Sequence, residues 1–499
     1  MATLSIALAA SLCFAPALAT PAPRWVSAAH PQLRPTSSFA ARRPLLRPTL
    51  SATSSTTPND NGPAKKPVNP YLVLTALVLL FVSNQWARNL PSFLVAFDSA
   101  GQAGRTGREL MNLALNFDAQ QYGLLVSYGF TLLYVACSFP AGIACDIFPR
   151  KTVLLASAFG WSSATALAAA AQTYLQLLAG RVLLGMTQAF SGPAAHTLIS
   201  TTFPPHRRAT ANAIYTSGIY LGAALASVSV LLTRSIGWRA TCLTVAAATV
   251  PPAILLAVAL PNDAPTRPST SAVSAAPITA ATTPSSAFAR VLSTPSVRWL
   301  LAGVAARLFA GFAIGAWAAP YYRSAFPERA GAYALINALI VAGGGTFAAV
   351  SGGVIADRLS TRAAAGDAGT GEARKALLPM LGALIAIPFW LTAIRASSFA
   401  VAMAALLLSY LAAETWYGAT IAMLQGALPR RVWGTAQGTM NLVQVVANLS
   451  PLLLGALHRR GAPLKLLLSI TIPAAYVATA LFFLMAMRAR RAEGKVVEE

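Results

Sequence analysis

Charged residues are scarce in this chain. Only 10% of its 499 residues are Asp, Glu, Lys or Arg, whereas a soluble globular protein carries about 25%. Acidic residues are the rarer kind, with 14 against 37 basic residues and a net charge of +23. The basic residues stand singly or in pairs between apolar runs, without a basic helix or a patch of alternating basic and aromatic residues. The charge therefore does not indicate nucleic-acid binding, and the low charge content predicts a protein that faces lipid.

Cysteine and histidine are also rare. The four cysteines and four histidines form no CxxC pair and no set with the spacing of metal ligands. We therefore predict neither a disulfide framework nor a metal site, and we interpret the cysteines as small apolar residues within helices. No catalytic triad or nucleotide-binding motif is visible by spacing. The sequence thus favours a protein that is not an enzyme and has no cofactor.

The first 68 residues differ from the rest. A short apolar run, TLSIALAASLCFAPALA, precedes five arginines among Ser, Thr, Ala and Pro, and no acidic residue occurs before Asp60. This composition is typical of a transit peptide. The two pieces in series resemble the bipartite presequence of algae with complex plastids, with ASLCFAP (10–16) as its phenylalanine-centred cleavage motif. We expect residues 1–68 to be a targeting presequence and the protein to lie in a plastid membrane, such as the envelope. The alternatives are a green-lineage transit peptide and a secretory signal, the latter implying a secretory-pathway membrane.

Apolar runs of about twenty residues recur from Tyr71 onward, which is the length that a helix needs to cross a bilayer. The predicted spans lie near 71–97, 119–143, 152–172, 174–201, 209–232, 239–260, 299–321, 331–355, 376–395, 399–427, 433–456 and 464–487. Loops rich in Lys and Arg follow the second, fourth, eighth and tenth spans, and the C-terminal tail is also basic. Both termini are therefore predicted on one side of the membrane, the cytosol or, after plastid import, the stroma.

A Pro/Ser/Thr/Ala-rich segment divides the spans into two sets of nearly equal length, as a duplication of six helices predicts. The predicted fold class is an all-α membrane protein with twelve transmembrane helices in two six-helix bundles. The predicted parts are an N-terminal bundle at 71–260, a disordered linker at 261–298, a C-terminal bundle at 299–487 and a polar tail at 488–499.

Two similar charged stretches occupy equivalent places in the two halves. AGIACDIFPRKTV (141–153) and SGGVIADRLSTRA (351–363) each follow the second span of their half, with a glycine four residues before an aspartate. The glycine would let a neighbouring helix approach closely, and ion pairs of the aspartate could form in one conformation and break in another. The alternative is two ordinary basic loops that follow the orientation rule. We predict a conformational latch composed of Gly142, Asp146, Arg150, Lys151, Gly353, Asp357, Arg358 and Arg362.

This pattern resembles the signature loop of the major facilitator superfamily, although Ile147 and Pro149 stand where that family usually has a base and a glycine. Three segments resemble its spinster-like branch and, less closely, its organic-anion and phosphate branches: GWSSATAL (160–167), RVLLGMTQAFSGPAAHTLISTTFPPHRRA (181–209) and GWRATCL (237–243). The resemblance implies the major facilitator fold and alternating access for lysolipids or organic anions, often driven by protons.

Four charged residues lie well inside predicted spans, away from the ends, where a charge costs about 2.5–3.5 kcal/mol at mid-bilayer. They are Arg88, Arg181, Arg307 and Glu414, in the four spans that line the cavity in proteins of this superfamily. Three cations against one carboxylate favour an anionic substrate, because a guanidinium binds phosphate or carboxylate through two hydrogen bonds. Two of the arginines have structural alternatives. Arg181 could bond to backbone carbonyls, and Arg307 could extend to the membrane surface.

Other polar and aromatic residues are weaker candidates for substrate contact. Asn441 and Gln444 belong to a polar face of the eleventh span, which either borders the cavity or bonds to a neighbouring helix. Trp317 ends the seventh span together with two tyrosines, and we interpret it first as a membrane-interface anchor and second as part of a substrate site.

Spinster-like proteins usually have an aspartate and a glutamate at two positions where this chain has Ala87 and Gln188. Neither residue can carry a proton, so proton coupling through these two positions is not expected. Glu414 is the remaining candidate for binding and releasing a proton. The predicted function is a secondary-type transporter of a small organic or lipid-like anionic solute, with inorganic phosphate or an organic carboxylate as the alternative substrate class. A transporter-shaped sensor or scaffold is the alternative function. The expected partners are a small-molecule or lysolipid substrate and the lipid bilayer, with no nucleic acid, and the expected state is a monomer.

Overall fold

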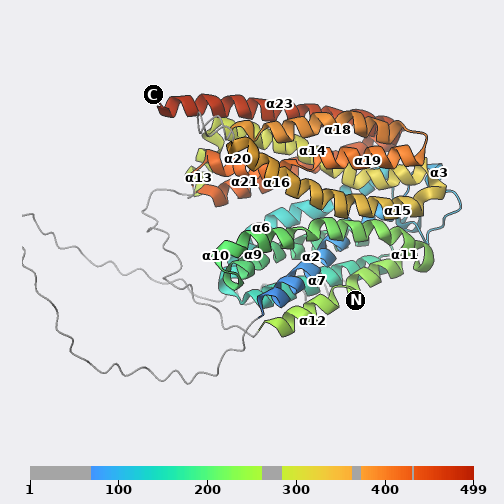
Figure 1. Cartoon of the computed structure of the whole chain (residues 1–499). Coiled ribbons are helices and arrows are strands. Elements are labelled where there is room, and N and C mark those ends of the chain that lie inside the picture. Colours follow the sequence, from blue (N-terminus) through green and yellow to red (C-terminus); the bar gives the residue numbers. More distant parts are fainter. Residues whose placement is uncertain (1–68, 261–283, 362–372, 430–431, 499) are drawn as a thin grey trace, which may run out of the picture. The chain divides into compact units, whose positions relative to one another are not determined.

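Long helices lying side by side make up most of the described part of the chain (Figure 1). The computed structural model describes residues 69–260, 284–361, 373–429 and 432–498, and the predicted presequence falls outside these ranges. The first half contains α2 (Pro70–Asn89), η1 (Leu90–Phe93), α3 (Ser99–Gln102), α4 (Met111–Leu115), α5 (Ala119–Val126), α6 (Tyr128–Ile147), α7 (Arg150–Ala170), α8 (Tyr174–Gln188), α9 (Ser191–Thr202), α10 (Pro205–Thr216), α11 (Gly218–Ala247) and α12 (Val250–Ala259). The second half contains α13 (Pro284–Ser293), α14 (Pro295–Ala325), η2 (Pro327–Arg329), α15 (Ala330–Leu339), η3 (Ile340–Gly344), α16 (Gly345–Thr361), α18 (Leu377–Arg395), α19 (Phe399–Ala413), α20 (Trp416–Ala427), α21 (Trp433–Ala447), α22 (Leu449–Arg459) and α23 (Leu464–Glu498).

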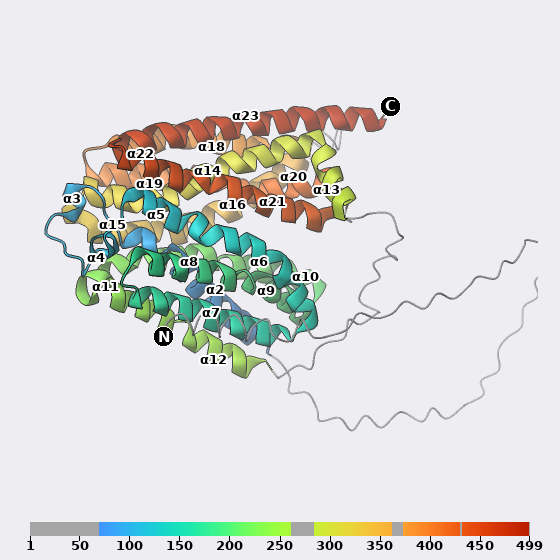
Figure 2. The same ribbon diagram turned by 180° about the vertical axis from the view of Figure 1, so that it is seen from behind.

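The helices of each half gather together, and the two groups lie next to each other (Figures 1 and 2). In both views α3 lies at one end of the helices, which we call the α3 end. The helices α10 and α13 and the C-terminal end of α23 lie at the opposite end, which we call the α13 end.

Ten helical stretches of the described chain are long and apolar enough to cross a membrane. One of them, Thr210–Ala259, has 50 residues. At about 1.5 Å per residue this is more than twice the thickness of the hydrocarbon core, about 30 Å. Gly237 interrupts it with φ 83° and ψ 164°, a conformation that favours glycine. The stretch therefore accounts for the fifth and sixth predicted spans, and α8 with α9 occupies the fourth, so the all-helical two-bundle fold fits the prediction.

Two boundaries predicted from the sequence are wrong. The predicted linker 261–298 contains α13 and the start of α14. Val291 of α13 is fully buried in a core cluster with Val432 and Ala436, which explains why this short helix is ordered. The predicted polar tail 488–499 continues α23 as helix as far as Glu498.

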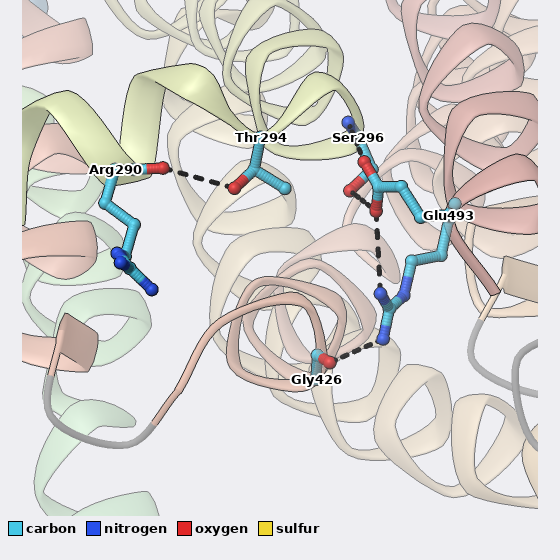
Figure 3. Close-up of polar contacts among 6 residues, drawn as sticks. Arg290, Thr294, Ser296, Gly426 and Glu493 are labelled. Atoms are coloured by element: carbon cyan, nitrogen blue, oxygen red, sulfur yellow. Dashed lines mark hydrogen bonds and ion pairs between the residues drawn. The ribbon is translucent and has the colours of Figure 1, made fainter. Parts of the chain in front are cut away.

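The end of α23 is fastened to the start of α14 (Figure 3). The Glu493 carboxylate accepts hydrogen bonds from the Ser296 backbone N–H at 2.9 Å and from the Ser296 hydroxyl at 2.7 Å. Arg490 contacts the same carboxylate at 3.5 Å and donates to the Gly426 carbonyl at 2.6 Å. Glu493 thus satisfies a backbone N–H in the first turn of α14, where helical partners are missing.

The two halves approach most closely where α5 packs on α22. A Cβ on Gly123 would lie 2.6 Å from the Pro451 carbonyl oxygen, and a Cβ on Gly455 would collide with the Ala119 carbonyl. Because neither glycine has a side chain, the two backbones can come into contact.

Candidate functional site

Arg88 lies near the end of α2, inside the first half. Its guanidinium carbon stands 4.4 Å from the centroid of the Phe130 ring and 5.4 Å from that of Tyr134, both on α6. Within the described part of the chain, no carboxylate and no hydrogen-bond acceptor binds this guanidinium. Aromatic faces stabilise a cation without occupying its N–H donors. Arg88 is therefore held in place with its donors available.

Arg181 on α8 makes a different set of contacts. Its guanidinium donates to the carbonyls of Ala87 at 3.3 Å, Arg88 at 3.0 Å and Leu125 at 3.5 Å. The Ala87 carbonyl has no helical partner because Pro91, four residues later, lacks an N–H. Arg181 replaces that missing donor. Its contacts are those of an arginine that bonds to backbone carbonyls, which is the structural alternative given above for this residue.

Arg307 on α14 is paired with Glu414, which lies at the break between α19 and α20. Its Nη2 stands 2.7 Å from Glu414 Oε1, and it also donates to the Ala413 carbonyl at 3.0 Å. The side chains are 4% and 21% exposed, so Arg307 is enclosed in protein rather than extended to the membrane surface. The rings of Trp416 and Tyr476 flank the guanidinium at 5.4 and 5.6 Å. The second half thus holds a compensated ion pair, whereas Arg88 in the first half is uncompensated.

A polar cluster that the sequence analysis missed lies beside Arg88 in the first half. Gln188 donates to the Asn84 carbonyl at 3.0 Å, and the Asn84 amide lies 3.5 Å from the Ser191 hydroxyl. Gln188 is 2% exposed, and its Oε1 has no hydrogen-bond partner in the described chain. A buried acceptor without a donor is costly, so this atom is available to a donor from a ligand or water. Asn84 and Arg88 are four residues apart and share one face of α2, a spacing that could have indicated the cluster.

The weaker candidates lie elsewhere. Asn441 is exposed and accepts a hydrogen bond from Gln444 at 3.3 Å, so these two amides bond to each other along α21. Trp317 is fully buried, and its indole N–H donates to the Pro451 carbonyl at 3.1 Å. The prediction of a membrane-interface anchor at Trp317, Tyr321 and Tyr322 is wrong, because all three side chains are buried between helices and bond to backbone carbonyls. The apolar sequence around them does not reveal that they face neighbouring helices.

The residues of the predicted latch are only partly described. Arg362 and the side chains of Asp146 and Asp357 lie outside the description. Lys151 donates to the carbonyls of Ala257 and Leu260 at 2.7 and 2.6 Å, which ties the start of α7 to the end of α12. Arg150 is partly buried, and Arg358 is exposed at the end of α16. The latch therefore stays a prediction.

The predicted reason for the two latch glycines is wrong. A Cβ on Gly142 or on Gly353 would meet no atom within 4 Å. The close approach in the second half occurs at Gly352, one residue earlier, where the Thr415 backbone packs against the glycine. The sequence pattern placed the contact on the wrong face of α16 because adjacent residues of a helix point about 100° apart.

The GWR stretch has a structural role in the first half. Trp238 bonds to the loop before α4, through its backbone N–H to Arg108 and its indole N–H to Gly107. Arg239 donates to the carbonyls of Ala169 and Ala171 at 2.6 and 2.7 Å, which holds the end of α7. The motif thus joins α11 to the loop before α4 and to the end of α7.

Several contacts join the two halves toward the α3 end. Tyr122 donates to the Ala316 carbonyl at 2.7 Å, and Ser227 donates to the Ala334 carbonyl at 2.9 Å. Two ion pairs cross the same junction, His458–Asp98 and Arg459–Asp118, each at 3.4 Å. These contacts hold the halves together at the α3 end.

The pattern of the Major Facilitator Superfamily matches residues 71–451. The chain belongs to this superfamily. Two solved structures of a bacterial homologue of the human lysosomal transporter Spinster share its fold. The inward-facing, unoccupied one has a TM-score of 0.66 at 20% identity, over 87% of this chain and 98% of the other. The inward-facing, occupied one has a TM-score of 0.64 at 20% identity, over 87% and 99%.

Curated members of the superfamily match shorter stretches. The D-galactonate transporter of Escherichia coli O6:H1 is 30% identical over 111 residues, 22% of this chain and 26% of that protein. Probable anion transporter 2, chloroplastic, of Oryza sativa subsp. japonica is 36% identical over 123 residues, 23% of each chain. The hexuronate transporter of Bacillus subtilis is 28% identical over 158 residues, 30% of this chain and 37% of that protein. The matches thus cover well under half of these relatives.

Proposed function

We propose that the protein is a secondary transporter that moves a small organic anion across a membrane by alternating access. The observation that carries the proposal is the Arg88 guanidinium, which lies over the stacked rings of Phe130 and Tyr134 without a counter-ion in the described chain. Arg88 is partly buried in a span that faces lipid, and an uncompensated cation there is costly unless an anion joins it. A carboxylate or phosphate can take up the free donors of Arg88 through two hydrogen bonds.

The substrate that fits best also carries hydroxyl groups. The free Oε1 of buried Gln188 requires a donor, and the nearby Asn84 and Ser191 offer both donors and acceptors. A hydroxylated carboxylate supplies the anion for Arg88 and the donor for Gln188, whereas inorganic phosphate lacks a carbon skeleton to span both. Relatives named as D-galactonate and hexuronate transporters support this choice over a lysolipid.

Uptake into liposomes tests the proposal. Purified protein is reconstituted, and uptake is measured for D-galactonate, glucuronate, inorganic phosphate and a lysophospholipid. We expect the sugar acids to be taken up and Arg88→Gln to lower their apparent affinity about tenfold, since a hydrogen bond to a charged group is worth about 1.5–3 kcal/mol. Arg395→Gln, at an exposed arginine at the end of α18, is the control. Uptake of none of these solutes, or an Arg88→Gln variant with unchanged affinity, would contradict the proposal.

The proposed location is a plastid membrane. The Arg- and Ser-rich residues 1–68 support it, as does the similarity to a rice protein named chloroplastic. A fluorescent protein fused after residue 70 should enter plastids. A fusion that stays in the secretory system would contradict this location.

A further inference from the structure

Three arginines from the two halves meet at the α3 end. Arg323, near the end of α14, is 4% exposed and donates from Nη2 to the Phe93 carbonyl of η1 at 2.6 Å. Arg323 belongs to the second half and Phe93 to the first. A buried arginine of one half thus contacts the backbone of the other.

The other two arginines cross the same junction in the opposite direction. Arg105, in the loop after α3, donates from Nη2 to the Pro327 carbonyl at 3.4 Å. Arg234 on α11 lies over Gly331 of α15, because a Cβ on that glycine would stand 3.2 Å from Arg234 Nη1. Both side chains come from the first half and reach the α14–α15 connection of the second.

These three guanidinium groups interact with one another. The charge of Arg234 repels that of Arg105, and the charges of Arg105 and Arg234 both repel that of Arg323. Glu109 is the acidic residue that acts on Arg105 and Arg323. Burial, followed by the charge of Arg234, lowers the pKa of Arg105. Glu109 is the one carboxylate among these interacting groups, so positive charge is in excess among them.

We propose that Arg105, Arg234 and Arg323 form a binding site for a phosphate group, which links the two halves at the α3 end. A phosphate group offers acceptors to more than one guanidinium at once and neutralises the excess charge that Glu109 leaves. Arg234 is exposed and Arg105 partly exposed, so the group can enter from solvent or from the lipid surface. Because the arginines come from both halves, occupancy favours the arrangement in which the α3 end is closed.

The test measures the thermal unfolding of the full chain with inorganic phosphate as the probe. In nanodiscs of neutral lipid, phosphate should raise Tm more than chloride at equal ionic strength. The double variant Arg105→Gln/Arg234→Gln should weaken the apparent phosphate affinity at least about tenfold. A parallel arm without phosphate uses nanodiscs containing an anionic phospholipid and shows whether a headgroup can supply the same group.

Three controls make the outcome specific. Arg395→Gln removes an exposed arginine outside the cluster and should leave the phosphate effect unchanged. Arg88→Gln should also retain it, which separates this site from the proposed transport site. Stabilisation that chloride reproduces, that survives in the double variant or that disappears in Arg88→Gln would overturn the proposal, whether or not the protein transports sugar acids.

Discussion

Tyr122 of α5 donates a hydrogen bond to the Ala316 carbonyl of α14, an oxygen that has lost its helical donor. The residue four positions after Ala316 is Pro320, inside the same helix. Proline has no backbone N–H and leaves the carbonyl four residues earlier unpaired. The Tyr122 hydroxyl supplies the missing donor from the other half. Arg181 does the same for the Ala87 carbonyl, which lacks a helical donor because Pro91 lies four residues later. In lipid, where water cannot fill the gap, such a replacement matters more than in a soluble protein.

Replacing Tyr122 with phenylalanine should lower stability by about 1 kcal/mol, because the Ala316 carbonyl is left buried without a partner. In a Pro320→Ala background the new N–H can satisfy the same carbonyl, so the loss caused by Tyr122→Phe should shrink toward zero. Thermal unfolding of the four proteins of this double-mutant cycle gives the coupling. Equal losses in the two backgrounds would contradict the role given to Pro320.

The two arginines of the first half should respond differently to substitution. Arg88→Met should weaken sugar-acid binding about tenfold or more and change stability little, because its donors are free in the described chain. Arg181→Met should instead cost about 1–3 kcal/mol of stability by leaving buried carbonyls unpaired. Binding isotherms and unfolding curves of both variants check this. If Arg181→Met alone abolishes binding at unchanged stability, the assignment is reversed.

Glu414 should compete with the substrate for Arg307. Glu414→Gln removes the carboxylate that pairs with Arg307 at 2.7 Å and leaves the guanidinium available to an anion. We expect the variant to bind the substrate about tenfold more tightly. Binding isotherms of the variant and the wild type decide the matter. An unchanged affinity would show that Glu414 does not compete with the substrate.

The pair of His458 and Asp98 should make the closed α3 end sensitive to acid. His458 Nδ1 faces the Ala462 carbonyl at 2.9 Å and so carries a proton, while Nε2 faces Asp98 at 3.4 Å. The hydrogen bond from His458 lowers the pKa of Asp98, with a smaller contribution from Ser324. A lowered carboxyl pKa stabilises the folded state above the ordinary value of 3.8, and the stabilisation disappears as pH falls through the lowered value.

Asp98→Asn should therefore unfold at a lower temperature than the wild type at about pH 6, and the difference should shrink as the pH falls below 3.8. Unfolding temperatures of both proteins over this range test the sign. Asp118→Asn, which removes the other ion pair of the junction, serves for comparison. A difference between the wild type and Asp98→Asn that grows toward acid would exclude the assignment.

Glu493 should stabilise the start of α14 from the far end of the chain. Glu493→Ala removes both acceptors of Ser296 and should cost about 1 kcal/mol, as loss of a helix cap does. Arg488→Ala, at an exposed position of the same helix, is the matched control and should have little effect. Unfolding curves compare the two. If both variants unfold like the wild type, the capping contact contributes nothing.

The sequence predicted the helical spans and the division into halves because these follow from the length and hydropathy of continuous segments. It failed where neighbouring helices decide the outcome. The Pro/Ser/Ala-rich stretch before Pro295 has the composition of a linker, yet it contains α13, whose Val291 is buried in the core cluster of the second half. Trp317 has the sequence context of an interface anchor, but α22 together with Phe97 and Tyr122 of the first half buries it.

The candidate site was predictable in part for the same reason. Arg88, Arg307 and Glu414 stand out because charge is rare in apolar spans. The pairing of Arg307 with Glu414 depends on a helix break that composition does not reveal. Gln188 and Ser191 were difficult to identify because uncharged polar residues are common in helices, and their significance depends on which acceptor is left without a donor.

The backbone contacts of Gly123 with Pro451 and of Gly455 with Ala119 have a mechanical consequence. Because bare main chain meets bare main chain there, no interlocking side chains must change rotamer before the helices separate. The two backbones can therefore slide or part at these points. The resistance to opening at this edge then resides in the polar contacts around it and in the packing of Tyr122 and Phe97 against Trp317.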